Sequence, residues 1–136
     1  MKLIKIFFIL LVLSITLSAC TSTKLADSYD EKLVTERAKE IVAMINSQNF
    51  DQVNAEIRDD LQDQLTAEKL EEAIGAKLVE AGAFLEYQST ATLGQKSKTS
   101  GEDYAVVVLV GKYENGNVVY TISMDSNLDI VGLYFK

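Results

Sequence analysis

The stretch YAVVVLVGKYENGNVVYTISM, residues 104–124, decides the fold class of this chain of 136 residues. Its first half is apolar at successive positions, which is typical of a strand that lies inside a sheet. Asn115 and Gly116 then give the sequence signal of a tight β-hairpin. In the second half every other residue is apolar and points to one face: Val118, Tyr120, Ile122 and Met124. The pattern predicts two antiparallel strands at the centre of a sheet.

Two further strands are predicted on either side of this hairpin. From residue 84 the sequence again has a period of two, with alternate positions occupied by Leu85, Tyr87, Ser89, Ala91 and Leu93. Residues 130–135 form the last strand, after a turn at residues 125–127. The sheet therefore has four strands in antiparallel succession.

Three helices are predicted before the sheet. In the first, residues 28–47, Ser28 and Glu31 have the spacing of a capping box, and apolar residues recur at helical spacing: Val34, Ala38, Ile41, Val42 and Ile45. A short acidic helix follows to about residue 64, capped by Asn49 or Asp51. Thr66 caps the third helix, and Gly82 ends it. Helices followed by strands predict an α+β domain with the helices on one face of the sheet.

Composition narrows the range of functions. Histidine is absent, which excludes a Ser-His-Asp triad and the usual zinc site of a metalloprotease. The single cysteine, Cys20, allows no internal disulfide and no thiolate-rich metal site. Removal of Lys2 and Lys5 with an N-terminal leader lowers the net charge from −7 to −9. We expect so acidic a domain not to bind nucleic acid.

The N-terminus has the pattern of a secretory leader. Lys2 and Lys5 precede an apolar stretch that reaches at most from residue 6 to residue 17, and small residues follow. This stretch is shorter than the ~20 residues that a membrane-spanning helix needs. The pattern predicts a cleaved signal peptide over residues 1–19.

The end of the leader, Leu17-Ser18-Ala19-Cys20, resembles the lipobox of bacterial lipoproteins. The resemblance implies that Cys20 is linked to diacylglycerol, that cleavage occurs before it, and that the protein is held on the outer side of the cell membrane. Residues 20–27 would be the lipidated cysteine with its tether, and residues 28–136 the folded domain. The alternatives are an ordinary signal with an incidental cysteine, or a cysteine that acts as a reactive thiol.

From about residue 38 onward the chain resembles a bacterial family of unknown function with the cone-shaped fold of nuclear transport factor two. The similarity lies in residues 49–50, 65–70, 81–84, 113–116, and 125 with 130–133. It implies a curved four-stranded sheet wrapped around the N-terminal helices, and an accessory role. The chain departs from the family pattern at Leu128, where a glycine is expected in the last turn, because leucine tolerates a positive φ poorly.

Three tyrosines are the candidate pocket residues: Tyr87, Tyr104 and Tyr120. In the ketosteroid isomerases, which share the cone fold, a tyrosine and an acidic residue inside the cone transfer protons. No acidic residue shares the inward parity of Tyr120, so core packing is the favoured interpretation. Residues 125–129 match the opening of a calcium loop but lack its glycine and its final glutamate, and are read as a turn.

We therefore expect a membrane-anchored, non-catalytic accessory module that binds a small apolar ligand or an envelope protein. No catalytic residue, cofactor or metal is predicted. Two alternatives stay open. One is an isomerase-type or hydrolase-type enzyme that uses a carboxylate and a tyrosine in the cone. The other is a module that self-associates through the open face of its sheet.

Overall fold

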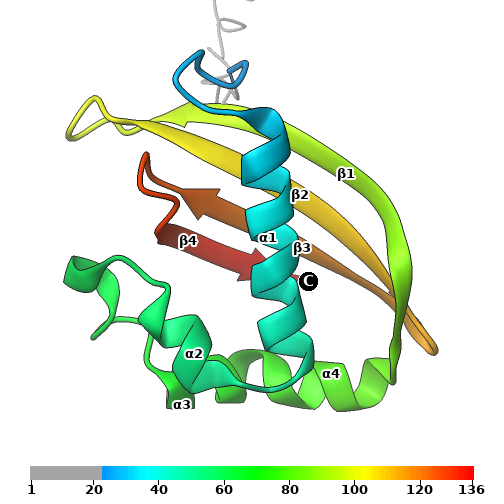
Figure 1. Ribbon diagram of the computed structural model, residues 1–136. Coiled ribbons are helices and arrows are strands. Elements are labelled where there is room, and N and C mark those ends of the chain that lie inside the picture. The colour runs from blue at the N-terminus through cyan, green and yellow to red at the C-terminus, as the bar shows by residue number, and fades with distance from the viewer. Residues whose placement is uncertain (1–22) are drawn as a thin grey trace, which may run out of the picture.

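A computed structural model describes residues 23–136. The predicted leader and the four lipobox residues, Leu17 to Cys20, lie outside this range. The sheet has four strands, each antiparallel to the next along the chain, in the order β1 (Phe84–Lys96), β2 (Asp103–Tyr113), β3 (Gly116–Met124) and β4 (Ile130–Phe135). It curves strongly without closing (Figure 1). The predicted α+β fold class, with a curved four-stranded sheet, is confirmed.

The helices lie on the concave side of the sheet. Helix α1 (Glu31–Asn46) crosses this side, while the shorter helices gather at one end of the sheet (Figure 1). These are α2 (Phe50–Ala55), the 3-10 turn η1 (Asp59–Leu61), α3 (Ala67–Leu70), the π-helical segment η2 (Glu71–Gly75) and α4 (Ala76–Ala81). Layered helices on one sheet face are what the order of helical and strand patterns predicts.

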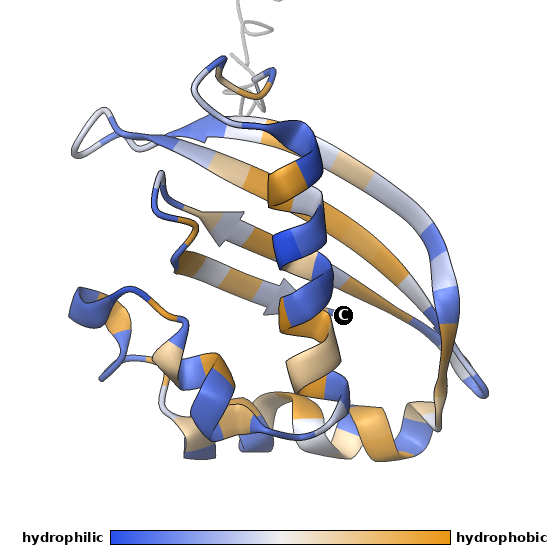
Figure 2. Ribbon diagram, viewed as in Figure 1, coloured by the Kyte–Doolittle hydropathy of each residue, from blue (hydrophilic) through white to orange (hydrophobic). Residues whose placement is uncertain are grey.

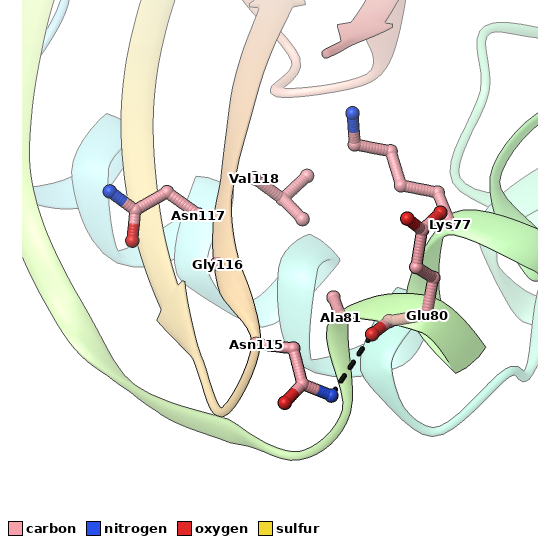
Figure 3. Close-up of a pocket in the computed structure, with 7 residues that line it drawn as sticks. All are labelled: Lys77, Glu80, Ala81, Asn115, Gly116, Asn117 and Val118. Atoms are coloured by element: carbon pink, nitrogen blue, oxygen red, sulfur yellow. Dashed lines mark hydrogen bonds between the residues drawn. The ribbon is translucent and has the colours of Figure 1, made fainter.

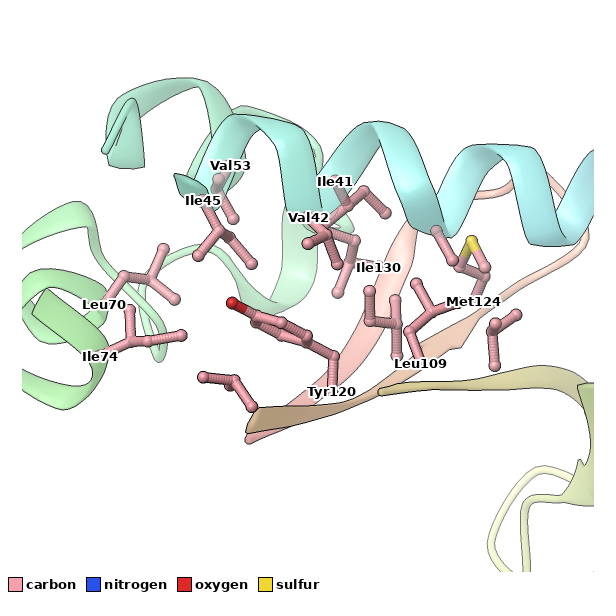
Figure 4. Packing of buried hydrophobic residues seen from close by; sticks show 14 of the residues in the cluster. Ile41, Val42, Ile45, Val53, Leu70, Ile74, Leu109, Tyr120, Met124 and Ile130 are labelled. Atoms are coloured by element: carbon pink, nitrogen blue, oxygen red, sulfur yellow. The ribbon is translucent and has the colours of Figure 1, made fainter. Parts of the chain in front are cut away.

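The core lies between α1 and the concave face. The apolar side of α1 is turned toward the sheet (Figure 2), and all five of its predicted apolar residues are buried. From β3, Tyr120 projects into the space between α1 and the residues Leu70 and Ile74 (Figure 4). Its side chain is fully buried. The interior of the curved sheet is thus occupied by the protein's own side chains.

Two helix predictions need correction. The N-cap of α1 is Asp30, not Ser28: its carboxylate accepts a hydrogen bond from the backbone N–H of Leu33 at 3.1 Å. The second helix ends at Ala55 and does not reach residue 64. Backbone hydrogen bonds join Ile130 N–H to Glu56 O and Arg58 N–H to Ile130 O, so this segment leaves the helix to pair with the start of β4.

The third predicted helix is confirmed in extent but is not uniform. Asn49 caps α2 and Thr66 caps α3, as predicted, and Gly82 ends α4 with a positive φ of 81°. Between α3 and α4 the chain makes one π-helical segment, η2, which the apolar spacing did not indicate. Leu70, Ile74 and Leu78 are nevertheless all buried.

The strand bounds are close to those predicted, but the faces of β1 are not. Two register shifts, between Phe84 and Glu86 and between Tyr87 and Ser89, change the parity of β1 along its length. Thr92 consequently faces α1, where its hydroxyl lies 3.1 Å from that of Thr35. The residues of the alternating set from Leu85 to Leu93 therefore do not all share one face.

The β2–β3 turn lies one residue earlier than the predicted Asn115-Gly116 pair. Tyr113 pairs with Gly116, so the β2–β3 turn is made by Glu114 and Asn115. The last turn is stabilised by Asp125, whose carboxylate accepts hydrogen bonds from the N–H groups of Asn127 and Asp129. Leu128 has a φ of 62°, which explains why a glycine was expected there. Within residues 23–136, no helix combines the length and apolar composition that crossing a membrane requires.

Candidate functional site

A small hydrogen-bonded network joins two buried tyrosines to the partly exposed Asn46. The hydroxyl of Tyr113 donates to Oδ1 of Asn46 at 2.5 Å and lies 2.6 Å from the hydroxyl of Tyr120. Tyr113 comes from β2, Tyr120 from β3, and Asn46 from the last turn of α1. The network therefore joins the sheet to the helix that crosses it. Each hydroxyl has a partner, which is what a buried polar group requires to avoid a desolvation penalty.

Tyr87 lies beside this network. Its ring centroid is 4.9 Å from that of Phe84, and the Phe84 ring is in turn 5.4 Å from that of Tyr113. The ammonium group of Lys39 lies 5.4 Å from the centroid of the Tyr87 ring, at a distance that allows a cation–π contact. Tyr87 and Tyr120, two of the three predicted pocket residues, are thus neighbours through Tyr113.

Burial raises the pKa of these tyrosines. Desolvation, with a smaller contribution from Tyr113, raises the pKa of Tyr87 to about 12. Burial also raises the pKa of Tyr113 and of Tyr120. A tyrosine held neutral in this way is a poor base at neutral pH. Its neutral hydroxyl can donate and accept hydrogen bonds.

Tyr104, the third predicted pocket residue, lies elsewhere. Tyr120 pairs with Leu109 on β2, and Tyr104 is five residues further along that strand, at a distance of about 17 Å. Its hydroxyl donates to Glu102 at 3.3 Å. Tyr104 therefore belongs to a different cluster, and the three tyrosines do not form one pocket.

Tyr113 and Asn46 were missed as members of the network. Tyr113 has the same parity as Val107 and Leu109, both fully buried, but a strand that is apolar on both faces gives no parity signal. Asn46 stands four residues after Val42, so helical periodicity places it on the buried face of α1. A polar residue at an inward position was the available signal.

A second cluster consists of charged groups at the other end of the sheet. Arg37 on α1 forms an ion pair with Glu56, and Arg58 lies 2.7 Å from Asp60, 3.5 Å from Glu102 and 3.8 Å from Asp125. Only Asp125 among these is fully buried. The pairs connect the segment after α2 to α1, to the residue before β2 and to the turn before β4.

Metal binding has no support in this arrangement. The turn at residues 125–129 directs the carboxylate of Asp125 to backbone N–H groups of its own turn. In the part of the chain from residue 23 to residue 136, no group of three or more acidic or cysteine side chains is placed to hold a metal ion.

A shallow pocket lies between α4 and the β2–β3 turn (Figure 3). Its volume is about 160 Å³, and it is lined by Lys77, Glu80, Ala81, Asn115, Gly116, Asn117 and Val118. Asn115 closes one side by donating to the backbone oxygen of Glu80 at 3.1 Å. Sites for small organic ligands usually enclose about 300–1,000 Å³. The pocket is therefore small for such a ligand, and none of the predicted tyrosines lines it.

The first described residues are attached to the edge of the sheet. Thr23 and Gly94 exchange two backbone hydrogen bonds, at 3.0 and 2.7 Å, in an isolated antiparallel bridge. We call this pair the Thr23–Gly94 bridge. The residues predicted as the second half of a tether therefore begin as an ordered part of the domain.

The outer face of the sheet has no helix packed against it among residues 23–136 (Figure 1). The register places a row of uncharged residues across its centre: Ala91, Val108, Thr121 and Tyr134. Tyr134 is 70% exposed, and Val108 is partly exposed. Uncharged residues at the centre of this face are notable in a chain of which 24% is charged.

Comparison with known proteins gives a family and one structural relative. The sequence profile of DUF3887, described as a protein of unknown function, matches residues 38–133. The NMR structure of a protein from Ruminococcus gnavus ATCC 29149 superposes with a TM-score of 0.73 at 27% sequence identity, covering 83% of this chain and 96% of that one. No curated protein was found to match.

Proposed function

Starting from a chain that belongs to the DUF3887 family, whose members are described as proteins of unknown function, we propose a lipid-anchored, non-catalytic binding module on the outer side of a bacterial membrane. Its partner in this proposal is a neighbouring envelope protein. The observation that carries the proposal is the combination of a lipobox ending at Cys20 with the pairing of Thr23 to the edge of the sheet.

The position of Thr23 supports the anchor. Only two residues separate Cys20 from the Thr23–Gly94 bridge, so a lipid on Cys20 holds the domain close to the membrane surface. Two acyl chains on one residue give stable anchoring, since each buried methylene contributes about 0.8 kcal/mol. The chemistry of the anchor and the geometry of the domain are thus compatible.

The tyrosine network supports binding rather than catalysis. An enzyme of the isomerase type needs a carboxylate facing Tyr87 or Tyr120, with a pKa suited to proton transfer. In residues 23–136, the hydrogen-bond partners of these hydroxyls are the backbone oxygen of Lys39 for Tyr87 and the hydroxyl of Tyr113 for Tyr120. The interior also contains packed side chains where a substrate would have to enter, so a protein partner at the surface is favoured over a small apolar ligand inside.

We assign the fold, as part of the same proposal, to the cone type of nuclear transport factor two. The feature that supports this assignment is the curved antiparallel sheet that wraps around α1 without closing (Figure 1). In this domain the cone is filled by side chains such as Tyr120, Leu109 and Ile122.

The anchor is tested by Cys20→Ser in a bacterial cell supplied with labelled palmitate. Without the thiol no diacylglycerol can be attached, so the variant is expected to remain an unlabelled, unprocessed precursor. Ser18→Ala is the matched control, because it keeps a small residue in the lipobox and should be processed and labelled as the native chain. Normal cleavage and membrane retention of the Cys20→Ser chain would overturn the proposal.

A second candidate function is self-association through the outer face of the sheet. The uncharged centre of this face favours a second copy of the chain, because two copies of a strongly acidic domain repel each other least where neither presents charge. We expect the chain lacking its leader to form a dimer in light scattering. Val108→Glu should make it monomeric, whereas Val79→Glu, at a 75% exposed position on α4, should not. A native chain that is monomeric would contradict this candidate.

A further inference from the structure

The direction of the chain at the Thr23–Gly94 bridge is fixed by the pairing itself. The bridge is antiparallel, and β1 runs from Phe84 toward Lys96. Because the pairing is antiparallel, the N-terminal side of Thr23 faces the end of β1 at Lys96 and not its start at Phe84. That side carries the loop between β1 and β2, residues 97–102, which we call the β1–β2 loop.

The bridge depends on a close approach that only glycine allows. A Cβ atom built on Gly94 would lie 2.4 Å from the backbone oxygen of Lys24 and 3.2 Å from the Cα atom of Leu25. Both are backbone atoms, so a flexible side chain cannot relieve the contact. Any side chain at residue 94 must displace the start of the domain from the edge of β1.

Two further contacts hold the same segment. Leu25 is partly buried and packs against the core. The hydroxyl of Tyr29 donates to the backbone oxygen of Asp103 at 2.5 Å, at the start of β2. Residues 23–29 are therefore attached to the ends of both strands that flank the β1–β2 loop, and the segment has a defined orientation on the domain.

Because few residues separate Cys20 from the attached segment, a lipid on Cys20 limits how the domain can face the membrane. Three residues reach at most about 11 Å, whereas the ten residues of β2 from Asp103 to Lys112 extend over about 30 Å. We propose that the Thr23–Gly94 bridge holds the domain with its β1–β2 loop against the lipid head groups and its β2–β3 turn directed away from the membrane. This inference rests on the proposed lipid at Cys20.

The chemistry of the β1–β2 loop suits a head-group surface. It presents the ammonium group of Lys98 and three hydroxyl groups, from Ser97, Thr99 and Ser100. Its one acidic residue, Glu102, is turned to Arg58 and Tyr104. Asp27, Asp30 and Glu31 lie in the adjoining segment, so the orientation comes from the tether and not from net positive charge.

The orientation is measured with two lysine-to-cysteine variants of the full chain. Lys98→Cys labels the β1–β2 loop, and Lys112→Cys labels the exposed far end of β2. Because the lipid occupies the thiol of Cys20, the introduced cysteine is the only one that a maleimide fluorophore can reach. The labelled proteins are purified from membranes and placed in vesicles of phosphatidylethanolamine and phosphatidylglycerol that carry a nitroxide on their head groups. The label at residue 98 is expected to be quenched several-fold more strongly than the label at residue 112.

The role of the bridge is tested by repeating the measurement with Gly94→Ala. The added Cβ displaces Lys24 and Leu25, so the difference in quenching between the two labels should be lost. Gly75→Ala is the matched control, because its Cβ would meet its nearest neighbour at an ordinary 3.5 Å. If Gly94→Ala does not fold, a flexible insertion of Gly and Ser residues between Thr21 and Ser22 serves instead, since it lengthens the tether outside the described domain.

The possible failures have different signs. Equal quenching of the two labels, with one labelled thiol per molecule, would overturn the orientation while leaving the lipid anchor in place. An unchanged difference after the flexible insertion would overturn the role of the short tether. Two labelled thiols per molecule would mean that Cys20 is free, which contradicts both the anchor and the orientation that depends on it.

Discussion

Tyr113 brings a hydroxyl group into the interior, where it lies 2.5 Å from Oδ1 of Asn46 and 2.6 Å from the hydroxyl of Tyr120. Tyr113 is 3% exposed and Tyr120 is fully buried, so water cannot readily replace either partner. Loss of the Tyr113 hydroxyl would leave the buried Tyr120 hydroxyl with its full desolvation cost, whereas Asn46 is partly exposed.

Tyr113→Phe should therefore destabilise the protein by about 1–3 kcal/mol, because it leaves both Asn46 and Tyr120 without this partner. Urea denaturation gives the free energy of unfolding. Tyr134→Phe removes the same atom from a side chain that is 70% exposed, and should leave that free energy nearly unchanged. Equal effects of the two substitutions would contradict the network.

The same burial predicts how stability depends on pH. The pKa of Tyr87 is raised to about 12 in the folded protein, and burial raises those of Tyr113 and Tyr120, whereas an unfolded tyrosine keeps a pKa of about 10. A raised pKa stabilises the fold below the unfolded value, and this contribution is lost as the pH rises toward the folded value.

The free energy of unfolding should therefore fall between the unfolded tyrosine pKa of about 10 and the folded pKa of Tyr87, about 12. Chemical denaturation across this range measures the fall, and the absorbance of the phenolate form follows the titration of the six tyrosines. A free energy of unfolding that stays constant over this range, with all six tyrosines titrating together, would contradict this prediction.

At the residue scale the sequence is informative where a clear period exists. Alternation in residues 118–124 placed Tyr120 inward, and the structure buries it fully. Tyr113 was missed because its strand is apolar on both faces, and Asn46 was missed because it is polar at a position where helical periodicity indicates a core residue. The wide separation of Tyr104 from Tyr87 depends on the strand register, which no single stretch of sequence contains.

Helix α1 ends in a tight turn with a left-handed residue, Gln48. Gln48 N–H bonds to Ile45 O, and Asn49 N–H bonds to Met44 O, which together form a Schellman motif. This motif requires a positive φ after the C-cap, and Gln48 supplies it at 58°. An exposed glutamine in this conformation is strained where glycine would not be.

Gln48→Gly is expected to stabilise the protein by about 0.5–1 kcal/mol, because relief of the left-handed strain exceeds the added entropy of the unfolded chain. The matched variant Gln52→Gly, at an exposed position within α2, should instead cost about 1 kcal/mol or more, through loss of helix propensity and of the hydrogen bond that Asn49 Nδ2 donates to Gln52 Oε1. Thermal or urea denaturation distinguishes the two signs. Destabilisation by Gln48→Gly would show that its side chain makes contacts that outweigh the backbone strain.

Element boundaries were predictable where local chemistry fixes them. Asn49 and Thr66 cap their helices, Gly82 ends α4, and β4 begins at Ile130, all as the sequence indicated. The early end of α2 was not predictable, because it results from pairing between Ile57 and Ile130, which are far apart in the chain. The bulges of β1 have the same origin in long-range pairing.

At the scale of the whole molecule, the domain has two different ends. One end carries residues 23–29 and the β1–β2 loop, and the other carries α4, the β2–β3 turn and the shallow pocket (Figure 1). The α+β class and the order of the strands followed from the succession of periods in the sequence. Anchoring of the domain to a membrane is predicted from the pattern of residues 17–20 alone, and chemical analysis of Cys20 is needed to detect the lipid.

The most direct test of the lipid anchor is the mass of the N-terminal peptide of the protein purified from bacterial membranes. Lipid anchoring predicts a peptide that begins at Cys20 and carries a diacylglyceryl group on its thiol. A peptide that begins elsewhere, or one that begins at Cys20 with an unmodified thiol, would contradict it.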